Sequence, residues 1–199
     1  MKTIIIDNFL PYPGVVRSWA LQQEYYNSEQ ITEKYGNYTS WPGKRTDHVM
    51  CLDADYANNI LSRVIDLVRV NFIKPVSSVK SYFQICTSAD GDSWVHQDNN
   101  VIAAAVLYLS PNADINSGTI LYRCKDLEKW TNLHISDMMK INREERKDLY
   151  DSLFEETDFI GNVYNRLVLY SGLAFHKSNK YFGNDRFDGR LTQTFFISE

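Results

Sequence analysis

The chain has 199 residues, 44% of them hydrophobic and 23% charged, which suits one globular domain with its own core. Its formal net charge of −4 gives no electrostatic case for binding nucleic acid or an anionic membrane. The three cysteines form no zinc pattern, and no apolar run approaches the length of a membrane span or a signal-peptide core. We therefore expect a cytoplasmic protein; its oligomeric state is left open.

The first third of the chain predicts one strand and two helices. Residues 3–6 are β-branched and favour a short buried strand. Pro13 favours a helix from there to about residue 27, because the missing N–H costs little in a first turn, and 31–47 reads as a loop. A clearer helix is expected over 55–72, capped by Asp53 or Asp55 and ended by Pro75. Its apolar residues recur at helical spacing: Ile60, Val64, Leu67, Val68 and Phe72.

From Val79 onward the sequence becomes rich in β-branched and aromatic residues, as is typical of strands. Strand candidates are 79–87, 93–97, 101–109, 119–123, 163–170 and 191–197. One charged helix is expected at about 137–156, where Asn142 and Glu145 resemble a capping box. Helices first and many short strands afterwards predict an α+β protein, mainly β, with a sandwich or barrel core.

One histidine is followed by a carboxylate at the spacing that a metal needs. His96 lies in WVHQDNN with Asp98 two residues later, and residues i and i+2 of a strand point to the same face. The pair would present an imidazole and a carboxylate to a common point. By itself the motif is weak evidence, because acidic residues are common in this chain. A hydrogen-bonded structural pair is the alternative interpretation.

A second histidine and an arginine follow in an informative order. His176 comes after an apolar strand and a Ser-Gly turn, and it would complete the two-histidine, one-carboxylate face of iron(II) oxygenases. Arg190 follows 14 residues later. Strand alternation places Arg190, Thr192 and Thr194 on one face, where a planar guanidinium and two hydroxyls could grip a carboxylate. The alternative for Arg190 is a surface charge at the start of a strand.

This ordered set, HxD, a distal histidine and then an arginine, resembles the iron(II)/2-oxoglutarate-dependent dioxygenase superfamily, nearest to its prolyl-hydroxylase-like branch. The resemblance covers roughly residues 79–198. It implies a double-stranded β-helix (jelly roll) core with supporting N-terminal helices. It also implies one domain over 1–199, with 1–78 as a helical support region. Residues 79–199 would form the core, interrupted by an insertion at about 124–160.

The resemblance also assigns roles to residues of this chain. His96, Asp98 and His176 match the Fe(II) ligands, and Arg190 matches the residue that pairs with the distal carboxylate of 2-oxoglutarate. Further contacts with this co-substrate would come from Tyr108, Thr194, Thr192, and Tyr82 or Gln84, beside the turn and strand at 117–120. The implied reaction uses molecular oxygen, hydroxylates an unidentified substrate and releases succinate and carbon dioxide.

The substrate end of the site is not readable from the sequence. A peptidyl residue, an amino acid and a small metabolite all stay open, and candidate lining residues are Trp41, Arg45, Trp94, Asn99 and Asn100. The segment WPGKRTD at 41–47 resembles an uncharacterised subgroup of these oxygenases. Two other hypotheses compete: a non-catalytic double-stranded β-helix binding protein, and a cupin-type metalloenzyme with no need of Arg190. His48 and His134 are given no metal role.

Overall fold

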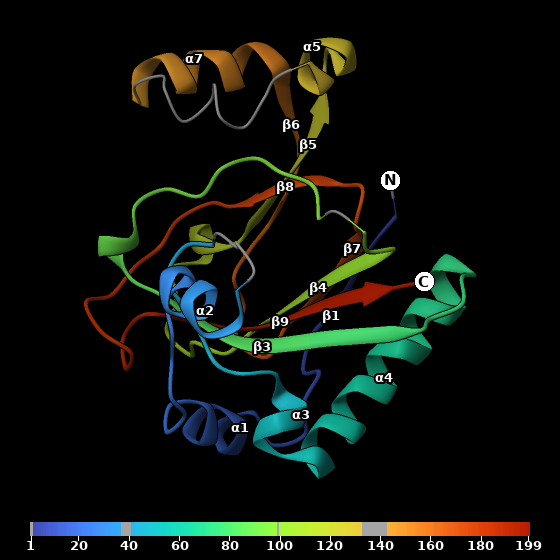
Figure 1. Ribbon diagram of the computed structural model, residues 1–199, viewed down its shortest axis with the longest axis vertical. Coiled ribbons are helices and arrows are strands. Elements are labelled where there is room, and N and C mark those ends of the chain that lie inside the picture. Colours follow the sequence, from blue (N-terminus) through green and yellow to red (C-terminus); the bar gives the residue numbers. More distant parts are fainter. Residues whose placement is uncertain (1, 37–40, 99, 133–142) are drawn as a thin grey trace.

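The computed structural model describes residues 2–36, 41–98, 100–132 and 143–199. Two antiparallel sheets form its centre (Figure 1). The major sheet has the order β1-β7-β4-β9-β3-β2 and the minor sheet has the order β6-β5-β8. Together with the helices, this arrangement confirms the predicted α+β, mainly β class with a jelly-roll core.

The strands of the major sheet are β1 (Thr3–Ile6), β2 (Lys44–Arg45), β3 (Ser78–Cys86), β4 (Ala103–Tyr108), β7 (Leu167–Ser171) and β9 (Arg190–Ser198). Those of the minor sheet are β5 (Thr119–Cys124), β6 (Phe154–Ile160) and β8 (Phe175–Ser178). The helices are α1 (Pro13–Ala20), α2 (Ser28–Tyr35), α3 (Val49–Leu52), α4 (Ala54–Phe72), α5 (Leu127–Thr131) and α7 (Arg143–Leu153). None of the helices in these described segments is long and apolar enough to cross a membrane.

The largest core lies between the helices and one face of the major sheet, where α1, α3 and α4 gather (Figure 1). Alternation along β9 sends Leu191, Phe195 and Ile197 to this face, where α4 contributes Ile60 and Val64. Burying each such apolar side chain stabilises the fold by roughly 1.5–3 kcal/mol. The residues of β9 at positions 190, 192, 194 and 196 face the minor sheet, so the helices leave that side of the sheet free to build a site.

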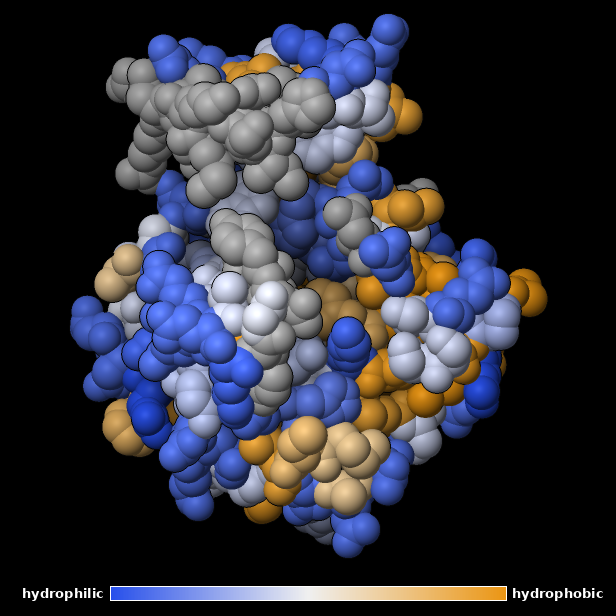
Figure 2. All heavy atoms as spheres, in the orientation of Figure 1, coloured by the Kyte–Doolittle hydropathy of each residue, from blue (hydrophilic) through white to orange (hydrophobic). Residues whose placement is uncertain are grey.

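The outer face of the minor sheet is covered separately. Phe154 and Phe175 pack with Trp130 of α5, with ring centroids 5.1 and 5.5 Å from Trp130. Helices α5 and α7 lie above this sheet and project from the body, and on the face drawn a recess separates them from the rest (Figure 2). This projecting layer falls within the predicted 124–160 insertion, which also contains strand β6.

Four predicted elements are wrong in extent or type. The helix expected to reach residue 27 ends at Ala20, and α2 occupies part of the expected loop. The signal for α2 is local: Asn27 and Gln30 form a capping box. The helix expected to run to residue 156 gives way at Phe154 to β6, because pairing with β5 overrides the charged composition. Residues 133–142, including His134, lie outside the described part.

The fourth error concerns 93–97, which was expected to be a strand. Only His96 pairs there, through an isolated bridge to His176. Strand β2, with two residues, and helices α3 and α5 had no counterpart among the predicted elements.

Gly43 fixes the approach of segment 41–45 to β3. Its φ is +71°, and an added Cβ would collide with Ile85 O and lie 2.7 Å from Cys86 Sγ. Gly36 has the same φ but nothing within 4 Å. We expect Gly43→Ala to lower the free energy of unfolding by about 2 kcal/mol or more, and Gly36→Ala by only about 1 kcal/mol. Urea unfolding of both variants measures the difference; equal losses would mean that the close approach is absent.

Candidate metal centre

Backbone hydrogen bonds bring the two distant histidines together. His96 N donates to His176 O at 3.0 Å and His176 N donates to His96 O at 2.9 Å, which is the hydrogen-bonded pair of an antiparallel bridge. Asp98 N donates to Gly172 O at 3.0 Å, in the turn that precedes β8. The HxD segment is therefore held by the β7–β8 turn and by β8, although it forms no strand.

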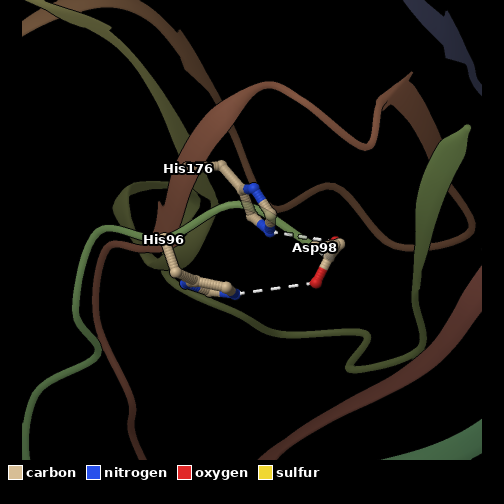
Figure 3. A group of neighbouring side chains, drawn as sticks. All are labelled: His96, Asp98 and His176. Carbon is tan, nitrogen blue, oxygen red and sulfur yellow. Dashed lines mark ion pairs between the residues drawn. The ribbon is translucent and has the colours of Figure 1, made fainter. Parts of the chain in front are cut away.

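The three side chains converge (Figure 3). His176 Nε2 lies 3.5 Å from Asp98 Oδ2, and His96 Nε2 lies 3.8 Å from Asp98 Oδ1. The donor atoms of all three residues lie within 4.8 Å of one another. The structure thus assembles the predicted triad of two imidazoles and one carboxylate.

The outer nitrogen of each imidazole is already engaged. His96 Nδ1 lies 2.9 Å from Trp94 O and His176 Nδ1 lies 2.9 Å from Ala174 O. A carbonyl can only accept, so each Nδ1 is the donor and each Nε2 of a neutral ring keeps its lone pair. Both lone pairs are then available to one metal ion, with the ring orientation fixed by the backbone.

Burial shifts the pKa values of His176 and Asp98. Burial and the neighbouring His96 lower the pKa of His176 to about 3, so this ring is neutral at physiological pH. Burial also raises the pKa of Asp98, although the His96 and Arg45 charges act in the opposite direction. Without a metal ion, the ionised Asp98 is therefore a destabilising group that a bound cation would compensate.

This charge predicts an effect on stability. Because the folded pKa of Asp98 is raised, its ionisation weakens the metal-free fold as pH rises above the unfolded value of about 4. At pH 7, we expect Asp98→Asn to raise the melting temperature of chelator-treated protein. Each kcal/mol gained in the free energy of unfolding should raise it by roughly 2–4 °C. The gain should shrink as the pH falls through about 4, because below that value the wild-type carboxyl is protonated in both states. A lower melting temperature for the variant at pH 7 would contradict this assignment.

Arg190 lies in the same interior, between the two sheets. It is 3% exposed, and its Nε donates to Ser117 O at 3.0 Å, just before β5. Its Nη2 is buried and has no hydrogen-bond partner, and the same is true of the hydroxyl of Thr192. The guanidinium carbon lies 5.4 Å from the ring centroid of Tyr108. This group of unpaired donors is suited to an acceptor-rich anion.

Tyr108 belongs to this environment through its hydroxyl, which is 2.7 Å from Thr119 Oγ1 on β5. Burial raises the pKa of Tyr108 even though Arg190 lowers it, so the phenol keeps its proton and can donate. Thr194 lies on the predicted face, but its hydroxyl already donates to Tyr82 O at 3.3 Å. Thr192 is thus the hydroxyl beside Arg190 that lacks a partner.

The remaining sequence candidates have varied surroundings. Tyr82 packs its ring against His48, 5.6 Å between centroids, and His48 itself caps α3 by accepting from Met50 N. Trp94 is 37% exposed with its ring 6.2 Å from that of His96. Asn100 is exposed with φ +63°. Asn99 lies outside the described residues.

Two aromatic neighbours of the site were not predicted. Tyr170 of β7 is buried, and its ring centroid lies 4.7 Å from that of His176. Tyr181 is buried and lies 5.9 Å from the Arg190 guanidinium carbon. Alternation along 167–171 could have placed Tyr170 on the same face as Val168, whereas Tyr181 lies in a loop with no such signal.

Comparison with solved structures gives the class to which the fold belongs. A prolyl-4-hydroxylase from Pseudomonas putida aligns at 13% identity over 99% of this chain and 92% of its own, with a TM-score of 0.55. HygX from Streptomyces hygroscopicus, with nickel, 2-oxoglutarate and hygromycin B bound, aligns at 14% identity over 98% and 82%, with a TM-score of 0.62. A 2OG-Fe(II) oxygenase family protein from Burkholderia pseudomallei aligns at 9% identity over 98% and 84%, with a TM-score of 0.59.

The chain therefore has the fold of the prolyl-hydroxylase-like 2-oxoglutarate/iron(II) oxygenases, which confirms the predicted resemblance at the level of fold. It belongs to a family of unknown function (DUF6445), whose model matches residues 1–197. No protein of curated function matches its sequence.

Proposed function

We propose that this protein is an Fe(II)- and 2-oxoglutarate-dependent dioxygenase that hydroxylates an organic substrate. One observation carries the proposal. A triad of two imidazoles and a carboxylate, of which His176 is buried, shares the interior between the sheets with Arg190, a buried guanidinium that keeps an unpaired donor. A metal centre alone would not need that cation.

The triad fits Fe(II). Two imidazole nitrogens and one carboxylate oxygen on one face are the donor set of non-haem iron(II) oxygenases, and they leave further coordination positions open. Both imidazoles have their Nδ1 hydrogen bonded to backbone carbonyls, an arrangement that orients ligating histidines. His96, Asp98 and His176 would hold the metal.

The surroundings of Arg190 fit the distal carboxylate of 2-oxoglutarate. The unpaired Nη2 of Arg190 and the unpaired hydroxyl of Thr192 are buried donors that a carboxylate would satisfy. The neutral Tyr108 hydroxyl is a third donor within this group. Thr194 and Tyr82, already hydrogen bonded to each other, would shape the wall of this region.

When bound, Fe(II) and 2-oxoglutarate would supply the oxidising chemistry with molecular oxygen, releasing succinate and carbon dioxide and hydroxylating a C–H bond. The protein's residues would do the positioning. Arg190 orients the co-substrate by its far end and takes no part as acid or base. Tyr170, buried against His176, fixes that ring and helps to exclude water.

The substrate is a small molecule or a peptide. We propose that residues 1–199 act as one domain, because helices α1, α3 and α4 of the first 78 residues share a core with β4, β7 and β9. The projecting α5–α7 layer is then an appendage to the minor sheet.

The proposal is tested by succinate release. Purified protein with Fe(II), 2-oxoglutarate and oxygen should convert a slow background amount of 2-oxoglutarate to succinate even without a primary substrate. Omitting Fe(II) or adding a chelator should stop it. If succinate does not form although both Fe(II) and 2-oxoglutarate bind, the chain is the non-catalytic binding protein considered above.

A further inference from the structure

Segment 41–45 is fastened onto the side of the major sheet that faces the minor sheet. The carbonyl of Pro42 accepts hydrogen bonds from Gln84 Nε2 at 2.8 Å and from Cys86 Sγ at 3.4 Å. Arg45 pairs with Gln84 as part of β2 and exchanges two backbone hydrogen bonds with Tyr26, each 2.8 Å long. The backbone of Arg45 is thus held on both sides, so its side chain has a fixed origin.

The guanidinium of Arg45 lies over two aromatic rings. Its central carbon is 4.8 Å from the ring centroid of Trp41 and 5.3 Å from that of Phe196. Phe196 is on the face of β9 that also carries Arg190, Thr192 and Thr194. Stacking on flat rings leaves the edge of the guanidinium, with its N–H groups, to meet a ligand in plane.

The polar contacts of Arg45 are incomplete. Its Nη2 donates to Gln84 Oε1 over a long 3.3 Å, whereas its Nε is buried and has no partner. The indole Nε1 of Trp41 is likewise buried without a partner. Among the residues that the structure describes, no carboxylate forms an ion pair with Arg45. Two buried donors, on residues whose guanidinium and ring lie against each other, are left without an acceptor, a costly arrangement unless a ligand completes it.

The guanidinium of Arg45 lies over Phe196, which is at the level of the triad in the major sheet. Through β4, Phe196 is in register with Tyr170 of β7, whose ring centroid lies 4.7 Å from that of His176. Arg190 begins the same strand, six residues before Phe196. The site therefore has two cations with different aromatic rings beside them.

We propose that Arg45 and Trp41 bind a carboxylate of the substrate that is hydroxylated, while Arg190 holds 2-oxoglutarate. The inference rests on the proposed function and adds the substrate class: an organic acid or an amino acid with a free carboxylate. A carboxylate has only acceptors, so it can satisfy the Arg45 Nε–H and the Trp41 Nε1–H together. An internal peptide residue lacking a carboxylate would leave both donors unpaired.

The test uses the N–H groups themselves. In ¹H–¹⁵N spectra of protein loaded with diamagnetic Zn(II) and saturating 2-oxoglutarate, acetate is titrated at constant ionic strength, with neutral acetamide as its counterpart. We expect acetate to shift the Arg45 Nε–H and Trp41 Nε1–H signals saturably, and acetamide to shift them at least about tenfold less at equal concentration. The Arg190 Nε–H signal should respond to 2-oxoglutarate and not to acetate.

Matched variants separate the donors. Trp41→Phe keeps an aromatic ring without the N–H. It should weaken acetate binding several-fold, as measured by the shift of the Arg45 Nε–H signal. Arg45→Lys keeps the charge without the planar fork and should remove most of the response of the Trp41 signal. Lys44→Gln removes a neighbouring exposed cation and should change nothing.

The outcomes are distinct. If acetate leaves the Arg45 signal unmoved, acts no better than acetamide, or loses its effect once 2-oxoglutarate is bound, the carboxylate subsite is overturned. If the Arg190 signal fails to respond to 2-oxoglutarate with Zn(II) present, the proposed function fails instead, whatever acetate does.

Discussion

His176→Ala should abolish Fe(II)-dependent succinate release and weaken metal binding by more than roughly 100-fold. Loss of a residue that merely orients a ligand already costs 10- to 100-fold in metal affinity, so loss of a ligand itself should cost more. His176 also pairs with His96 through backbone hydrogen bonds. That pairing survives the substitution because it uses main-chain atoms. Metal content after dialysis and succinate release measure the two effects.

A matched control is His48→Gln, which removes a histidine outside the triad. His48 caps α3 and hydrogen bonds to Val79 O at 3.1 Å, so the change tests a structural histidine of the same fold. It should retain metal and succinate release within a few-fold. If His176→Ala retains stoichiometric iron, or if His48→Gln loses it equally, the assignment of the triad is contradicted.

Arg190→Gln should raise the 2-oxoglutarate concentration needed for half-maximal succinate release while leaving metal binding intact. Removing one partner of a buried, charge-assisted contact costs about 2–4 kcal/mol, or roughly 30- to 900-fold in affinity. The 2-oxoglutarate concentration that Arg190→Lys needs should lie between those of Arg190→Gln and wild type, because lysine keeps the charge but lacks the planar guanidinium. Titration of 2-oxoglutarate at fixed Fe(II) measures the shift.

The control for Arg190 is Arg123→Gln, an exposed arginine of β5 paired with Glu155. Because surface ion pairs contribute little to stability, the Arg123→Gln variant should keep the 2-oxoglutarate requirement of wild type. An unaltered requirement in Arg190→Gln would remove this residue from co-substrate binding. A large loss of iron in the same variant would point to a structural role.

Part of the candidate site's arrangement follows local rules and could be predicted from the sequence. Strand alternation placed Arg190, Thr192 and Thr194 on one face, and i, i+2 spacing directed His96 and Asp98 to one point. What the sequence could not show depends on long-range contacts. His96 and Asp98 are not in a strand; they are held by His176 and Gly172, more than 70 residues away. Which threonine has a free hydroxyl depends on a carbonyl of β3.

The same distinction explains the errors in the fold. Strand β2 has two residues and exists because Arg45 pairs with Gln84 on one side and Tyr26 on the other, so no periodicity could reveal it. Strand β6 has a charged sequence and is paired by β5. By contrast, α4 combines a capping Asp53 with an apolar stripe, and both are visible in the sequence. Local signals thus predicted α4, whereas tertiary pairing decided β2 and β6.

The most direct test of the central claim is an anaerobic visible spectrum of the Fe(II)-loaded protein with and without 2-oxoglutarate. If His96, Asp98 and His176 hold iron and 2-oxoglutarate binds to it, adding the co-substrate should produce a weak visible charge-transfer band. The band should require more 2-oxoglutarate in Arg190→Gln and should be absent in His176→Ala. A wild-type protein that binds Fe(II) and gives no band, or a His176→Ala variant that keeps one, would contradict the account.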